Sequence, residues 1–188
     1  GNVSVDGLAC GGRRVGNVGA DHNFQSDSLN RFMLDAKLLA DNSTVLTAEG
    51  TYLTGGDGSL AFRVTIPSLP MTLANAFLPE DAAQLEGALT GWMSISGSTA
   101  NPVINGYIRF NAGRVRGPMT GTTYGLASTP IRFNNSTLNL NRFSLTSSDN
   151  QALVLDGTLD LRDFHGMSTG LTINASGFDW TNSTSQGG

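Results

Sequence analysis

Apolar and polar residues alternate along most of the chain, which is the period-two pattern of β-strands with one apolar face. The clearest run places Leu60, Phe62, Val64 and Ile66 on one face. Comparable runs cover residues 32–40, 46–52, 85–95, 104–110 and 153–161, and weaker ones cover 3–8, 13–20, 115–133, 138–145 and 171–175. Clusters of Gly, Asn, Asp, Ser and Pro separate the runs, as is typical of turns. The pattern predicts an all-β chain.

One small pattern recurs within these strands: an apolar or small residue, a glycine two places later, and an apolar residue after two more. It occurs in Ala48–Tyr52, Leu85–Leu89, Ile104–Ile108 and Leu155–Leu159. All three marked positions of each copy share one strand face. Glycine on the concave side relieves crowding where a sheet bends. We therefore expect an elongated, curled antiparallel or mixed sheet with an apolar concave face.

Turn residues and a slip in the alternation predict the local irregularities. Turns are expected at residues 41–43, 54–58, 97–102 and 111–113. The apolar positions shift by one residue between Leu140 and Phe143, which indicates a β-bulge.

One short helix is expected near residues 69–78, within an interruption of the strand pattern at 69–83. Ser68 is a suitable N-cap, Pro70 is tolerated in a first turn, and Pro79 ends the segment. Leu73 and Phe77 belong to its apolar stripe. The helix either closes one end of the β-core or acts as a plug lying in an apolar groove.

Composition narrows the class of protein. Only 14% of the 188 residues are charged, the net charge is −4 and the pI is about 4.9, which disfavours nucleic-acid binding. No polybasic segment and no run of apolar residues long enough to span a bilayer is present in the sequence. Cys10 is the single cysteine, so the sequence supports neither an internal disulfide nor a zinc cluster. We expect one β-rich segment over residues 1–188, with its start least certain over 1–30 and a polar tail at 182–188.

The run from Ile66 to Leu161 resembles the C-terminal region of the TamB translocation and assembly module family, related to the AsmA-like proteins. The resemblance rests on Leu85–Gly91, on Ile95–Ser98 leading through Asn101-Pro102 to Ile104–Gly106, on Gly125–Phe133 with Leu138 and Leu140, and on Leu153–Leu161. The segment from Leu69 to Leu78 lies where such proteins have a helix.

The resemblance implies a β-taco-like fold with an apolar lumen. It also implies that the chain is a periplasmic segment of a longer protein that is anchored in the inner membrane and reaches the outer membrane. Its implied roles are phospholipid transport between the two membranes and outer-membrane protein assembly with a BamA-type, TamA-like partner. Phospholipid acyl chains, and nascent outer-membrane β-strands as clients, would use the apolar groove without a cofactor, a metal or a reaction. The residues expected to line the groove are Phe62, Val64, Leu85, Leu89, Met93, Ile95, Ile104, Ile108, Phe110, Leu153, Leu155, Leu159 and Leu161.

Three alternatives stay open from the sequence. The same apolar residues could pack against one another in a dry core. The chain could be a secreted adhesin or autotransporter-like β-solenoid that acts through its outer surface. Unpaired sheet edges could also capture client strands by strand addition, which is compatible with lipid binding.

An enzyme is not expected. His22 and His165 lie far apart in the sequence and have no nucleophile or metal ligand at a productive spacing. Asp156 and Asp160 fall on the polar face of a strand, where carboxylates favour solubility. The glycine-rich turn at 54–58 lacks the Lys and the following helix of a phosphate-binding loop.

Overall fold

The computed structural model describes residues 2–10, 13–26, 31–75, 78, 83–117, 121–148, 151–162 and 169–176. Side chains are described for residues 31–75, 78, 83–117, 121–148, 151–162 and 170. These residues form one 12-stranded sheet and one short helix, which confirms the all-β prediction. The strands are β1 (Asn2–Cys10), β2 (Arg13–Ser26), β3 (Arg31–Ala40), β4 (Ser43–Leu53), β5 (Ser59–Pro70), β6 (Gln84–Gly97), β7 (Pro102–Arg116), β8 (Thr123–Leu126), β9 (Ile131–Asn134), β10 (Thr137–Ser147), β11 (Ala152–Asp160) and β12 (Thr169–Ser176).

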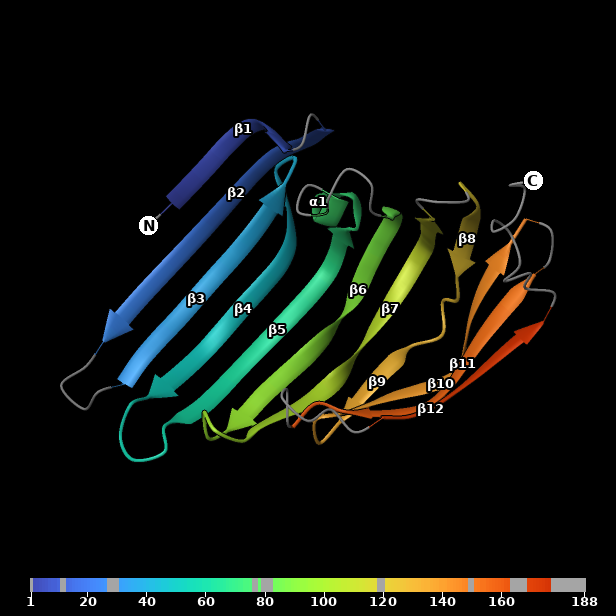
Figure 1. Ribbon diagram of the computed structural model, residues 1–188. Helices are drawn as coiled ribbons and strands as arrows, with labels where there is room; N and C mark the ends of the chain where they lie inside the picture. The colour runs from blue at the N-terminus through green and yellow to red at the C-terminus, as the bar shows by residue number, and fades with distance from the viewer. Residues whose placement is uncertain are drawn as a thin grey trace, which may run out of the picture.

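The sheet is an antiparallel meander in which strands that follow one another in sequence are mostly neighbours in space. Figure 1 shows β1 to β7 side by side in one twisted layer, with β10 to β12 turned against it at the other end. The short connections explain this order, because antiparallel strands can be joined by tight hairpins.

The strand position between β7 and β10 is filled by two short strands instead of one. β8 pairs with β7 at one end and with the corresponding part of β10, and β9 pairs with both strands at the other end. Residues 127–130 separate the two pieces and include Pro130, which lacks the N–H that a ladder needs. The sheet therefore has one interrupted strand, and its direction changes across that strand (Figure 1).

Most of the predicted irregularities are found. Asp41 and Asn42 both have positive φ, 47° and 63°, as a two-residue hairpin turn requires. The register of β10 with β11 shifts between Leu140 and Phe143, which confirms the predicted bulge. The turn predicted at 111–113 is wrong: β7 continues through it, and the register with β6 shifts between Glu86 and Ala88.

The helix is shorter than predicted. α1 spans Thr72–Asn75, and Leu69 and Pro70 instead extend β5, where Leu69 lies opposite Leu89 of β6. Pairing with the neighbouring strand thus outweighs the local helix signals. Phe77 of the predicted plug and the polar tail at 182–188 lie outside the described residues.

Candidate functional site

The strand registers bring most of the predicted groove residues onto one continuous face. Residues directly opposite in an antiparallel pair share a face, so each row across the sheet can be followed from strand to strand. One row contains Phe62, Ile95 and Ile104. The next contains Val64, Met93, Gly106, Phe133, Leu138 and Leu159. We call this side of the sheet, with its rows of apolar residues, the concave face.

The remaining predicted residues extend that face toward its ends. Leu89 lies opposite Phe110, and Leu85 lies opposite Val115 beyond the shift in register. Ile108 lies between Gly91 and Ile131. Leu153 and Leu155 face Leu145 and Phe143 of β10. Leu161 follows the end of β11, and its N–H donates to the carbonyl of Ser136 over 2.8 Å.

Curvature toward the apolar side is visible at the interrupted strand. The rings of Phe110 on β7 and Phe143 on β10 approach to 5.7 Å between centroids, although a strand position separates their strands. Two strands that flank a third lie roughly 9–10 Å apart in a flat sheet. The apolar side is therefore the inside of the bend, and Phe143 and Ile131 are among the most buried residues.

The concave face is apolar without being sealed. All thirteen predicted groove residues are half-buried, none of them fully. The fully buried apolar side chains of the described residues are few: Ala40, Val45, Ile66, Met71, Ile131 and Phe143. A sheet whose apolar face packs on a second layer buries most of that face. The described strands form one layer, so much apolar surface stays open to contact.

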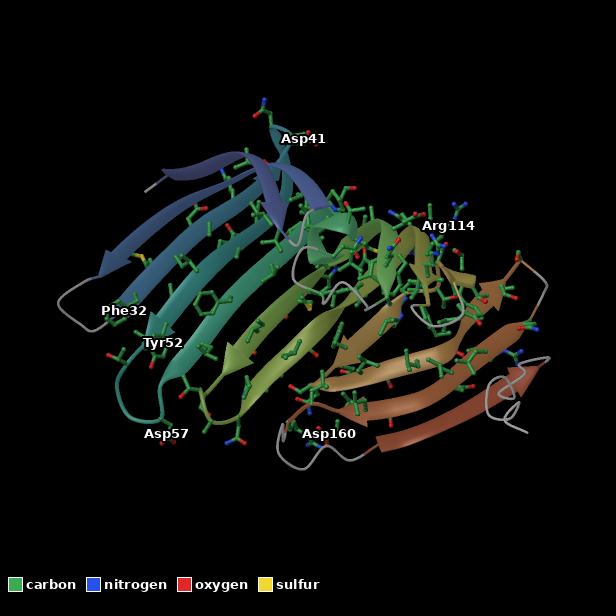
Figure 2. All side chains as sticks on the ribbon, turned by 45° about the horizontal axis from the view of Figure 1, so that its top comes forward. Phe32, Asp41, Tyr52, Asp57, Arg114 and Asp160 are labelled. Carbon is green, nitrogen blue, oxygen red and sulfur yellow. The ribbon has the colours of Figure 1, made fainter. Side chains whose placement is uncertain are left out.

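A hollow of about 550 Å³ lies on this face over β3, β4 and β5, and its lining comprises Phe32, Leu34, Tyr52, Thr54, Leu60, Phe62 and Thr99. The rings of Phe32 and Tyr52 stack at 6.2 Å with an interplanar angle of 24°. Figure 2 shows these two side chains near the end of the sheet that carries the turn at Asp57. The volume falls within the range of small-molecule sites.

Two loops are joined beside the hollow. The hydroxyl of Thr99 donates to the carbonyl of Asp57 over 2.8 Å, and the Thr99 N–H reaches the same oxygen over 3.4 Å. The β4–β5 turn is thereby fixed to the β6–β7 loop. The polar groups at this end contrast with the apolar rings of Phe32, Tyr52 and Phe62.

At the other end of the sheet, Asn75 holds the helix against β6. Its amide nitrogen donates to the carbonyl of Leu85, and its amide oxygen accepts from the Leu85 N–H, both over 2.8 Å. The side chain thus copies the hydrogen bonds of a neighbouring strand. Met71, directly before α1, is buried, and Leu73 of α1 is half-buried, so the start of the helix packs on the sheet.

Of the aromatic residues that line the hollow, the sequence predicts Phe62 as a groove residue but not Phe32 or Tyr52. Phe32 and Tyr52 were assigned to the apolar faces of their strands, and their register across the β3–β4 hairpin places them directly opposite each other. The Asp41-Asn42 turn alone would place Phe32 opposite Thr51, but the register shifts by one residue between Leu38 and Leu39, and this shift places Phe32 opposite Tyr52. The aromatic pair therefore depends on a β-bulge that the sequence pattern did not predict.

The described part of the chain holds no cluster of three or more His, Cys, Asp or Glu residues that could bind a metal ion. Asp160 accepts hydrogen bonds from the side chain and the backbone N–H of Arg162, and these lower the pKa of its carboxyl group to about 2. This pair lies on the face opposite the hollow. None of the helices described is long and apolar enough to cross a membrane.

Comparison of the chain with protein-family models, with curated proteins and with solved structures finds no match.

Proposed function

We propose that the concave face is a groove for phospholipid acyl chains, which it binds reversibly and without a reaction. The observation that carries the proposal is that all thirteen predicted groove residues lie half-buried on an apolar face without a second covering layer among the described elements. Each methylene buried there contributes roughly 0.8 kcal/mol. A few acyl carbons therefore suffice for binding that still permits movement along the groove.

The proposal extends to the setting that the family resemblance implies. The chain would be a periplasmic segment of a TamB-like, inner-membrane-anchored protein that passes phospholipid toward the outer membrane. A BamA-type, TamA-like partner would receive it there, and nascent outer-membrane strands would be a second kind of client. Support comes from the curled antiparallel sheet and its open apolar side.

Features of the fold favour this function over the alternatives. A dry core would bury the apolar rows, whereas the rows are half-exposed. A β-solenoid stacks its strands in parallel coils, whereas every strand pair described is antiparallel.

Photo-crosslinking along a single strand tests the groove. A benzophenone amino acid is placed at Phe62 or Val64 on the concave side of β5, or at Ala61 or Thr65 on the other side of the same strand. The purified protein is irradiated with vesicles of phosphatidylcholine alone, which carry no net charge, and analysed by mass spectrometry. We expect lipid adducts from Phe62 and Val64 and few from Ala61 and Thr65.

The four positions share one strand, so nonspecific binding of lipid to the protein affects both pairs alike. Equal adduct yields on the two sides, or no adducts from either, would rule out the groove. Adducts confined to the concave side support it.

A further inference from the structure

The charges of the chain are unevenly distributed. Residues 82–148 contain five of the eleven basic residues and one of the fifteen acidic residues, Glu86. The chain as a whole is acidic, so this central segment is a local basic region between two acidic ones. In the sheet it corresponds to β6 through β10.

Four of these arginines point away from the concave face. Arg109, Arg114 and Arg116 follow one another along the outer side of β7, and Arg114 lies opposite Glu86. Arg132 of β9 lies opposite Tyr107 of β7 on that side. At about 3.3 Å per residue, the β7 row extends over roughly 20 Å. All four arginines are exposed.

These arginines are available to bind an anion. The side chains of Arg109, Arg114, Arg116 and Arg132 make no hydrogen bond or ion pair with another residue in the part of the chain that the structure describes. Figure 2 shows Arg114 far from Phe32 and Tyr52. Guanidinium groups suit phosphate because they donate two parallel hydrogen bonds to it.

An exposed aromatic pair adjoins the arginine row. Trp92 is 42% exposed, the highest fraction among the large apolar side chains described. Its ring meets Tyr107 edge to face at 6.3 Å and 83°, and Tyr107 is in turn opposite Arg132. Trp and Tyr beside basic residues are typical of protein surfaces that lie at the membrane–water interface.

The four arginines lie on the outer side of the bent sheet, and this position favours a partner with a flat surface. They belong to β7 and β9, next to the interrupted strand where the sheet bends (Figure 1). On one flank, Asp35 and Glu49 share the outer side with Lys37 and Arg63. On the other flank, Asp160 is paired with Arg162 near Asp156. Neither flank is therefore net basic, and the outer side of the bend carries the basic surface that a flat anionic partner would contact.

We propose that the outer side of β6, β7 and β9 docks on the surface of an anionic phospholipid bilayer through Arg109, Arg114, Arg116 and Arg132, with Trp92 and Tyr107 at the headgroup level. The concave face is not involved, so this docking does not depend on acyl-chain binding in the groove. A nucleic acid would need the basic surface to continue over the strands on either side, whose outer sides are not net basic.

Vesicle binding tests the docking. The protein with Trp180→Phe, which leaves Trp92 as its only Trp, is titrated with vesicles of phosphatidylcholine and phosphatidylglycerol and with vesicles of phosphatidylcholine alone. We expect Trp92 fluorescence to shift to the blue only with the anionic vesicles, and binding to weaken with added salt. The double variant Arg114→Gln/Arg116→Gln should bind roughly 30-fold more weakly.

The double variant Lys37→Gln/Arg63→Gln is the matched control, because it removes the same charge from β3 and β5 on the same side of the sheet. It should retain most of the binding. An equal loss of vesicle binding in the two double variants would overturn the proposal. So would the absence of binding to anionic vesicles by the protein that retains all four arginines. Tight binding of single-stranded DNA without vesicle binding would also overturn it and assign the patch to nucleic acid. Circular dichroism verifies that both variants are folded.

Discussion

Gly106 lies in the middle of β7 with a φ of 139°, and a Cβ built on it would lie 2.1 Å from the carbonyl oxygen of Trp92 on the neighbouring strand. Gly91, diagonally across the ladder, has a φ of 152° and an equivalent clash with Tyr107 at 2.2 Å. L-residues rarely adopt such backbone, and here the neighbouring backbone fills the space as well. These glycines therefore serve the path of the chain itself, beyond the crowding on the concave face that the sequence pattern suggested.

The substitution Gly106→Ala should destabilise the protein by roughly 2–4 kcal/mol, because the strain and the clash both involve backbone that cannot move aside. Urea unfolding followed by circular dichroism measures the loss. Gly55→Ala is the control, since nothing lies within 4 Å of a Cβ at Gly55. Similar unfolding free energies for the two variants would contradict this account of Gly106.

Among the elements, the β9–β10 turn fixes three parts of the sheet to one another. The hydroxyl of Ser136, which is 1% exposed, donates to the carbonyl of Pro102 over 2.7 Å and accepts from the Ile104 N–H over 2.9 Å. The Ser136 N–H donates to the Ile104 carbonyl, and its own carbonyl accepts from Leu161. The start of β7 and the end of β11 are thus joined through one turn residue.

Replacing Ser136 by Ala should cost about 1–3 kcal/mol, since the Ile104 N–H and the Pro102 carbonyl lose their partner in a partly buried place. Hydrogen exchange at the Ile104 amide should become faster, which urea unfolding alone would not show. Ser128→Ala, at an exposed position between β8 and β9, is the comparison. Unchanged exchange at Ile104 would show that water replaces the hydroxyl.

The elements that could be predicted from sequence are those whose local signals agree with their pairing. Alternation from Leu60 to Ile66 predicts β5, and the slip before Phe143 predicts the bulge in β10. At 111–113 the turn residues are real, but pairing with β6 resumes on both sides, so Ala112, with a φ of 47°, adopts the turn conformation within a strand. The shared strand position of β8 and β9 depends on long-range pairing that no local pattern contains.

The candidate site likewise combines features that a local pattern predicts with features that depend on long-range pairing. The alternation of apolar and polar residues predicts that the thirteen groove residues lie on apolar strand faces, and the strand registers bring these faces onto one side of the sheet. The hollow near Phe32 and the arginine row beside Trp92 were not predicted, because each depends on which strands become neighbours. Charge is a clear example: the total of −4 gave no indication that the arginines of β7 and β9 gather on the outside of the bend.

At the scale of the whole molecule, the accessible surface is large for the mass. It measures 11827 Å², whereas a compact monomer of 19.7 kDa exposes roughly 8,600 Å². A single-layer sheet contributes to this difference, since it leaves both faces in contact with solvent. Folding of this chain therefore buries less accessible surface than folding of a two-layer domain of equal length.

The dependence of the unfolding free energy on urea should be correspondingly shallow. We expect an m-value below about 2 kcal/mol/M, where a compact chain of this length lies nearer the upper end of the 1–3 kcal/mol/M range. Equilibrium urea titration by circular dichroism measures it. A steep, compact-type slope would indicate that the concave face is covered in solution, which would also weaken the proposed groove.

The interrupted strand has a mechanical consequence. A continuous ladder resists bending because each strand is bonded along its whole length. The ladders between β7 and β10 are instead the two short ones of β8 and β9, supplemented by the contacts of Ser136 and of the Phe110–Phe143 pair. Stiffness against flexing is therefore lowest along this seam, and the sheet behaves as two stiff panels joined there. The angle between β1–β7 and β10–β12 at this interrupted strand therefore sets the distance between the two parts of the sheet, and with it the width of the groove that is available to a bound lipid.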